Sequence, residues 1–152
     1  MEDRLYEYIE EPQKLPKLME NYLEEYNAST SKTMDLVFFA DAIKHTSRLC
    51  RILRSPKGKA MLVGLGGSGK QSLTRLASFM CDYKIFQIEL SRGYGLVEFR
   101  EDLKKLCLMA GAQGESVVFL FTDNQIAKML QEYNVALFSC HGCSYVVLTN
   151  QC

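Results

Sequence analysis

A lysine and the glycines that precede it are the residues of this chain best suited to chemistry. Gly64 and Gly69 are separated by four residues, Lys70 follows directly, and an apolar run over 60–63 comes before them. Glycines permit positive φ and keep Cβ atoms away from a bound anion. The N–H groups and dipole of a helix that begins here favour phosphate. The spacing predicts a phosphate-binding loop, from which Lys70 reaches the β- and γ-phosphates of a nucleotide.

We expect the phosphates to be held by the loop and the first helical turn. The usual pattern places Ser or Thr directly after the lysine as a Mg²⁺ ligand, but this chain has Gln71 there. Ser72 comes one residue later, so its hydroxyl points to another side of the helix, although it remains a candidate Mg²⁺ contact. The departure predicts nucleotide binding with impaired hydrolysis. The candidate binding residues are Gly64, Gly66, Gly67, Ser68, Gly69, Lys70, Gln71 and Ser72.

A second candidate site follows the apolar run over 116–121, where Thr122 and Asp123 precede Asn124. In nucleotide hydrolases, one carboxylate at such a strand end holds Mg²⁺, and another residue orients the attacking water. If Asp123 is the metal-shell residue, then Asn124 replaces the base. If Asp123 is itself the base, then Thr122 replaces the metal-shell acid. Either alignment makes Asp123 the candidate catalytic and Mg²⁺-associated residue, and either predicts weak hydrolysis.

The elements that must position these residues alternate between strands and helices. Apolar runs predict strands over 60–63, 84–90 and 116–121, and helical spacing predicts helices after the loop and over 96–106. This order indicates an α/β fold with a parallel sheet that is covered on both faces. The preceding part of the chain predicts a helix over 17–26 and another that begins at residue 34.

Composition excludes several classes of partner. The chain has 152 residues, enough for one domain, and its 18 Lys and Arg balance 18 Asp and Glu. This balance gives no overall field for nucleic acid or an anionic membrane. No apolar run approaches the ~20 residues of a membrane span, and the acidic N-terminus is unlike a signal peptide. We therefore expect a cytoplasmic protein with reduced cysteines, three of them in helical patterns: Cys50, Cys81 and Cys107.

Four segments together resemble the fourth AAA+ module of axonemal dynein heavy chains. They are residues 34–39, the loop and helix start over 64–77, residues 86–95, and residues 119–123. The resemblance extends from about residue 5 to Ile126. It implies a P-loop NTPase (AAA+) core that is incomplete and preceded by N-terminal helices, with ATP or ADP and Mg²⁺ as ligands. In that family this module is an accessory or regulatory nucleotide site, and Gln71 and the Thr122-Asp123 ending resemble its degenerate form.

The resemblance also implies a setting and a division of the chain. The setting is the cytoskeleton of the ciliary axoneme, where other dynein AAA+ modules and dynein subunits are partners and microtubules are reached only through parts absent from this sequence. Residues 1–33 would form an N-terminal helical linker segment, and 34–126 a partial AAA+ core. The sequence has no match to the sensor, lid and arginine finger of the family, which again predicts weak or absent hydrolysis. The alternative is a truncated, non-catalytic isoform that acts only as an interaction fragment.

Residues 127–152 depart from the family pattern and predict a divergent C-terminal tail that need not be ordered. Val146–Asn150 has the pattern of a sensor strand that ends in Asn, but it follows Asp123 so closely that we favour the tail. Cys140-His141-Gly142-Cys143 has the spacing of half a zinc site or of a redox pair. Adjacent Cys140 and His141 fit one tetrahedron poorly, so we interpret these thiols as incidental.

Overall fold

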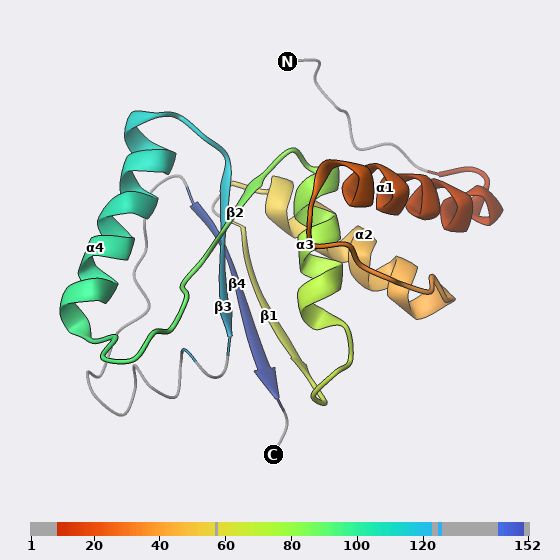
Figure 1. Ribbon diagram of the computed structural model, residues 1–152. Helices are drawn as coiled ribbons and strands as arrows, with labels where there is room; N and C mark the ends of the chain where they lie inside the picture. The colour runs from red at the N-terminus through yellow and green to blue at the C-terminus, as the bar shows by residue number, and fades with distance from the viewer. Residues whose placement is uncertain (1–8, 57, 123–124, 126–142, 151–152) are drawn as a thin grey trace.

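Four parallel strands form one sheet, in the order β1-β4-β3-β2, in the computed structural model, which describes residues 9–56, 58–122, 125 and 143–150. All four strands end at the same edge, at the bottom of Figure 1. This confirms the predicted α/β class with a parallel sheet. The strands are β1 (Lys59–Gly64), β2 (Lys84–Gln87), β3 (Val117–Thr122) and β4 (Cys143–Asn150).

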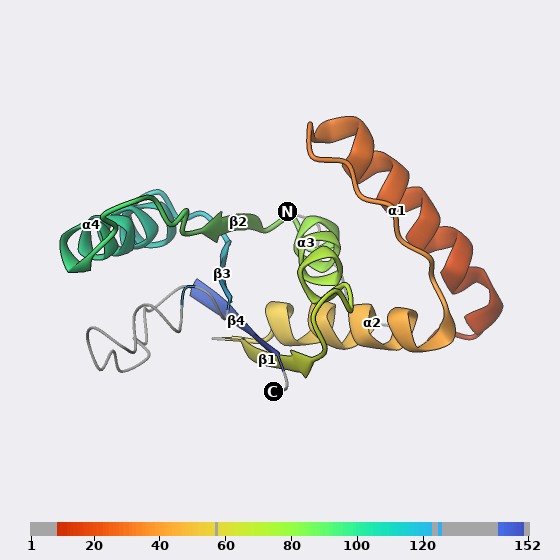
Figure 2. The same cartoon turned by 60° about the horizontal axis from the view of Figure 1, so that its bottom comes forward.

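Helices cover both faces of the sheet. Helices α2 (Ala40–Arg54) and α3 (Lys70–Met80) lie on one face, and α4 (Leu96–Cys107) lies on the other, as Figures 1 and 2 show. Connections between parallel strands are right-handed. Helix α3 belongs to the connection from β1 to β2, and α4 belongs to the connection from β2 to β3, which runs across the sheet in the opposite direction. Two right-handed connections that run in opposite directions place their helices on opposite faces. A π-helical turn, Leu108–Ala112, follows α4.

Strand β3 separates two apolar clusters. Alternate residues of a strand point to opposite faces, and here Val118 and Leu120 pack on the side of α2 and α3, while Phe119 packs on the side of α4. Every residue of β3 before Thr122 is buried. The first cluster consists of Leu49, Leu53, Ala77, Val118 and Leu120. The second consists of Ile88, Tyr94, Phe99, Leu106, Val117, Phe119 and Phe121.

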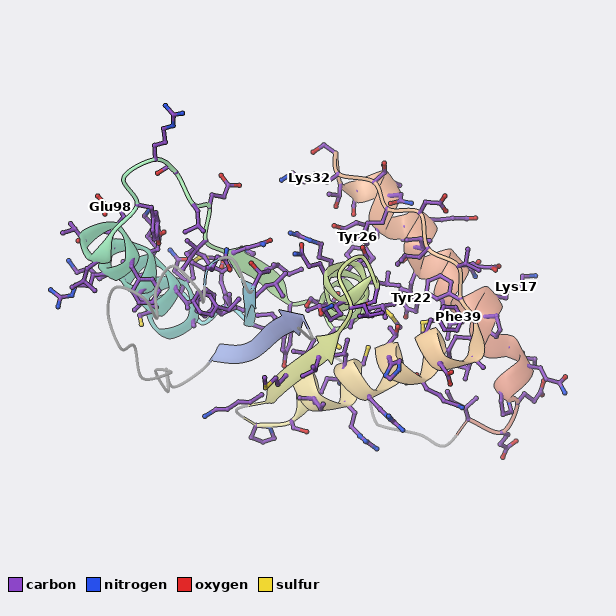
Figure 3. All side chains as sticks on the ribbon, turned by 90° about the horizontal axis from the view of Figure 1, so that it is seen from below. Lys17, Tyr22, Tyr26, Lys32, Phe39 and Glu98 are labelled. Atoms are coloured by element: carbon purple, nitrogen blue, oxygen red, sulfur yellow. The ribbon has the colours of Figure 1, made fainter. Side chains whose placement is uncertain are left out.

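Helix α1 (Leu15–Ser29) packs outside this core, against α3. The ring of Tyr26 meets the ring of Phe79 edge to face, with centroids 5.5 Å apart, and Figure 3 shows Tyr26 between the two helices. The predicted helix over 17–26 is thus present and longer at both ends. A short 3₁₀ turn, Pro12–Lys14, leads into it.

The next helix begins later than predicted. Helix α2 starts at Ala40, not at residue 34, and the chain before it is extended. The Asn27 side chain accepts a hydrogen bond from the Met34 N–H at 2.8 Å and donates one to the Met34 carbonyl at 2.9 Å. The bond to the Met34 carbonyl engages a group that a helix beginning at Met34 would use, and together the two bonds hold the extended chain in place.

The second strand is shorter than the predicted 84–90. It ends at Gln87, opposite Leu120 of β3. Beyond that point the Gln125 side chain replaces the ladder, because its amide nitrogen donates to the Ile88 carbonyl and its Oε1 accepts from the Thr122 N–H at 2.8 Å. Gln125 is 3% exposed. A buried side chain therefore joins the exits of β2 and β3.

Strand β4 lies within the predicted divergent tail over 127–152, of which Cys143–Asn150 is ordered as a strand. It lies between β1 and β3 and pairs with both. The objection that this segment follows Asp123 too closely was wrong. A parallel crossover needs about a dozen residues, and the chain supplies 20 from 123 to 142. The Cys140–Cys143 motif otherwise lies outside the described residues.

Leu53 tests the cluster between α2, α3 and the sheet, because it is fully buried there. We expect Leu53→Ala to lower the free energy of unfolding by about 3 kcal/mol, through lost burial and a cavity. Leu18→Ala makes the same change on α1, where the side chain is 45% exposed, and should cost less than about 1 kcal/mol. Urea denaturation followed by circular dichroism measures both. Equal losses would contradict the assignment of Leu53 to the core.

Candidate nucleotide-binding site

The predicted phosphate-binding loop joins β1 to α3 at the edge where the strands end (Figure 1). Gly67 and Gly69 have φ of 76° and 75°, which residues with a Cβ rarely adopt. A Cβ added to Gly66, Gly67 or Gly69 would meet no described heavy atom within 4 Å. The outer side of the loop is therefore open backbone that a ligand can approach closely.

The Lys70 ammonium group lies inside the loop. Its Nζ donates to the carbonyl oxygens of Gly64 and Leu65, at 2.8 and 2.7 Å, and lies 3.2 Å from Ser68 Oγ. A Cβ on Gly64 would lie 3.4 Å from Ser68 Oγ and 3.8 Å from Lys70 Nζ. The loop thus concentrates one positive charge and a hydroxyl on its inner side.

Helix α3 begins at Lys70 without a side-chain cap. Its first N–H groups have no partner within the helix, and the positive end of the helix dipole lies here. Gln71 is exposed and Ser72 is half-buried in this first turn. The next hydroxyl, on Thr74, is buried and donates to the Lys70 carbonyl at 2.8 Å. That bond commits the Thr74 hydroxyl to the helix itself.

The ends of β4 and β3 lie beside the loop. Asn150, the last residue of β4, pairs with Gly64, where β1 enters the loop. Thr122, the last residue of β3, pairs with Leu148, two residues before Asn150. Asp123 and Asn124 lie outside the described residues, but they follow Thr122 in the chain. Asn150 is a polar candidate that the sequence interpretation set aside, and its signal was the apolar run that ends in Asn.

Two further residues that the sequence interpretation did not single out connect the elements around the site. Arg75, on α3, donates from Nη2 to the side-chain oxygen of Gln87 at the end of β2. Gln125 joins Thr122 to Ile88, as described above. The Arg75 contact ties the end of β2 to the helix that follows the loop, whereas the Gln125 contacts tie the ends of β2 and β3 to each other. Arg75 and Gln87 are 12 residues apart, and Gln125 and Ile88 are 37 residues apart, so no local pattern could have identified these two contacts.

The donor set fits a nucleotide phosphate. Open glycine backbone, an uncapped helix start and a lysine ammonium group converge on one loop, and anion binding uses these three features together. The eight predicted binding residues lie at the end of β1, in this loop and in the first turn of α3. The described residues contain no cluster of three or more His, Cys, Asp or Glu that could hold a metal ion. Any Mg²⁺ here would therefore depend on hydroxyls, Asp123 and the phosphates themselves.

Tyr94, which lies just before α4, is an ionisable residue with a perturbed pKa. Burial, then a 2.7 Å hydrogen bond to Asp102, raise the pKa of Tyr94. The ring packs in the cluster beneath α4, so its role is structural.

Among the described helices, none combines the length and apolar character required to cross a lipid bilayer.

The family model for the P-loop containing dynein motor region D4 matches residues 34–141. The match begins before α2, includes the loop and Asp123, and extends past residue 126 into the segment that precedes β4.

Curated relatives agree with this match. Human dynein axonemal heavy chain 6 is 50% identical over 139 residues, which cover 90% of this chain and 3% of the relative. Human dynein axonemal heavy chain 10 is 50% identical over 127 residues, or 84% of this chain and 3% of the relative. The beta chain of the flagellar outer-arm dynein of Chlamydomonas reinhardtii is 52% identical over 114 residues, covering 75% and 2%.

The chain therefore spans about 3% of the length of the heavy chains that it matches. Its phosphate-binding loop and parallel sheet agree with the matched family model. The chain belongs to the P-loop containing dynein motor region D4 family.

Proposed function

We propose that this chain binds ATP or ADP as the fourth AAA+ module of an axonemal dynein heavy chain. The observation that carries the proposal is the convergence of the Lys70 ammonium group, open glycine backbone and an uncapped helix start on one loop. The phosphates would contact this loop and the first turn of α3, with Lys70 as their counter-charge. The family match and the names of the relatives support the module and the axonemal setting.

The site serves as an accessory or regulatory nucleotide site in which hydrolysis is weak or absent. Gln71 replaces the hydroxyl that usually ligates Mg²⁺, and Thr74 commits its hydroxyl to the Lys70 carbonyl. Bound Mg²⁺ would neutralise phosphate charge. Asp123 and Ser72 are the candidates to hold its shell, and Asn150 lies at the right register to approach the same edge.

Partners follow from the family and remain part of the proposal. Other dynein AAA+ modules and dynein subunits would flank this one, and microtubules would be contacted by other parts of the heavy chain. Residues 1–33 would serve as the helical linker and residues 34–126 as the main part of the core. Strand β4 extends that core to Asn150, because its pairing joins β1 to β3.

One observation favours the alternative, an interaction fragment without nucleotide. Strand β1 is one of the two outer strands of the described sheet. Met61 and Val63, on its face opposite α2 and α3, are 66% and 53% exposed. Exposed apolar side chains at an open edge favour association with another surface. Nucleotide titration separates the two functions.

Lys70→Ala tests nucleotide binding. We expect it to weaken binding of a fluorescent ATP analogue by about 10- to 100-fold, because a charge-assisted hydrogen bond contributes about 1.5–3 kcal/mol. Lys44→Ala removes an exposed lysine of α2, whose Nζ lies 3.3 Å from Asp41, and should leave the affinity unchanged. Circular dichroism confirms that both variants are folded. Absence of saturable binding by the unsubstituted chain would favour the interaction fragment.

Gln71→Thr tests the explanation for weak hydrolysis. It restores a hydroxyl directly after Lys70, so we expect Mg²⁺ to increase ATP affinity more in this variant than in the unsubstituted chain. Asp123→Asn should abolish the effect of Mg²⁺ and leave affinity in EDTA within about twofold, because one carboxylate of the metal shell is lost. Titrations with Mg²⁺ and with EDTA measure both effects. A Mg²⁺ dependence that neither substitution alters would refute these assignments.

A further inference from the structure

Two cysteines lie close together at the C-terminal end of α3, the P-loop helix, which is the end away from the loop. Cys50 lies on α2, and Cys81 directly follows α3 as its C-cap residue. Cys81 Sγ lies 3.8 Å from the Cys50 carbonyl oxygen, and Cys50 Sγ lies 3.9 Å from the Ala77 carbonyl oxygen. The Cys81 thiol thus contacts the backbone of Cys50, and the Cys50 thiol contacts the last turn of α3, which leads to Cys81. Both side chains are half-buried.

We propose that Cys50 and Cys81, the thiol pair, form a reversible disulfide that links α2 to the P-loop helix. A disulfide requires two thiols on backbones that already lie close together. Here the packing of α2 against α3 supplies that proximity, and Cys50 borders the cluster around Leu53 and Ala77. The nucleotide proposal does not use these residues, so the two proposals stand or fall separately.

The two thiols have different roles in this reaction. A hydrogen bond with Cys81, then burial, raise the pKa of Cys50, so its thiol stays protonated at neutral pH. A thiolate is the attacking species in thiol–disulfide exchange. Cys50 also packs against the apolar cluster, whereas Cys81 lies at the end of α3, so we assign the first attack to Cys81 and the resolving role to Cys50.

The oxidant is a small disulfide of the glutathione class. The Cys81 thiolate attacks one sulfur of oxidised glutathione, forms a mixed disulfide and releases one glutathione thiolate. Cys50 then attacks the Cys81 sulfur, loses its proton to solvent and releases the second glutathione thiolate. Two electrons pass from the pair to the oxidant, which becomes two reduced glutathione molecules. Excess reduced glutathione reverses both steps.

The link would constrain the P-loop helix at the end opposite its ligand. Helix α3 has 11 residues, which corresponds to about 16 Å at 1.5 Å per residue. The disulfide would join positions 31 residues apart and reduce the entropy of the unfolded chain. It should stabilise the fold against unfolding and leave the phosphate loop itself in place.

Peptide mapping of the full 152-residue chain tests the proposal. Trypsin releases Cys50 within residues 49–51 and Cys81 within residues 76–84. After treatment with oxidised glutathione and alkylation, we expect mass spectrometry to find these two peptides joined and to find them separate after reduction. Cys50→Ser and Cys81→Ser should each abolish the joined species, whereas Cys107→Ser, which alters an exposed cysteine of α4, should retain it.

A background with serine at positions 107, 140, 143 and 152 contains only the thiol pair and provides a second measurement. Oxidation should raise its midpoint of thermal unfolding by about 5–10 °C and change nucleotide affinity less than twofold. Glutathione that remains attached to Cys81, or alkylation of both residues in the oxidised, folded protein, would overturn the proposal. Failure to bind nucleotide would refute the proposed function and leave the disulfide result intact.

Discussion

Parallel pairing of the strands is the constraint on which the site depends. Because β1, β4 and β3 run in the same direction, their ends and the loop after β1 meet at a single edge. The buried residues of β3 fix this arrangement, because its side chains point alternately to the two faces and pack into a different apolar cluster on each face. A shift of one residue would exchange the two faces of the strand. The position of the loop relative to Asn150 is thus a consequence of core packing.

Local patterns predicted most of this architecture. The glycine spacing before Lys70 identified the loop, and the apolar run over 116–121 identified β3, because each signal lies within a few consecutive residues. The sequence interpretation was weakest where distant side chains decide the backbone. Asn27 holds Met34 extended and so delays α2, and Gln125 ends the β2–β3 ladder at Gln87. Neither interaction has a periodic signature in the sequence.

Strand β4 shows a different reason for failure. The sequence contains its pattern as Val146–Asn150, but this segment follows Asp123 so closely that the tail was favoured instead. Strand order in a sheet need not follow chain order, and a strand inserted between β1 and β3 is compatible with a crossover of ordinary length. The eight candidate binding residues follow from the motif alone and stay predictions, whereas the roles of Asp123 and Ser72 depend on a metal shell that a motif with Gln71 does not specify.

The central place of β4 has a consequence for how the chain reaches its native state. Residues 143–150 are synthesised after every other described element, yet they separate β1 from β3. Until they emerge, the two halves of the sheet have no hydrogen-bonded connection, and contacts between residues far apart in sequence form slowly. The edge that carries the candidate site is therefore completed last, and a nascent chain that stops short of this strand presents two open β edges to chaperones or to neighbouring chains.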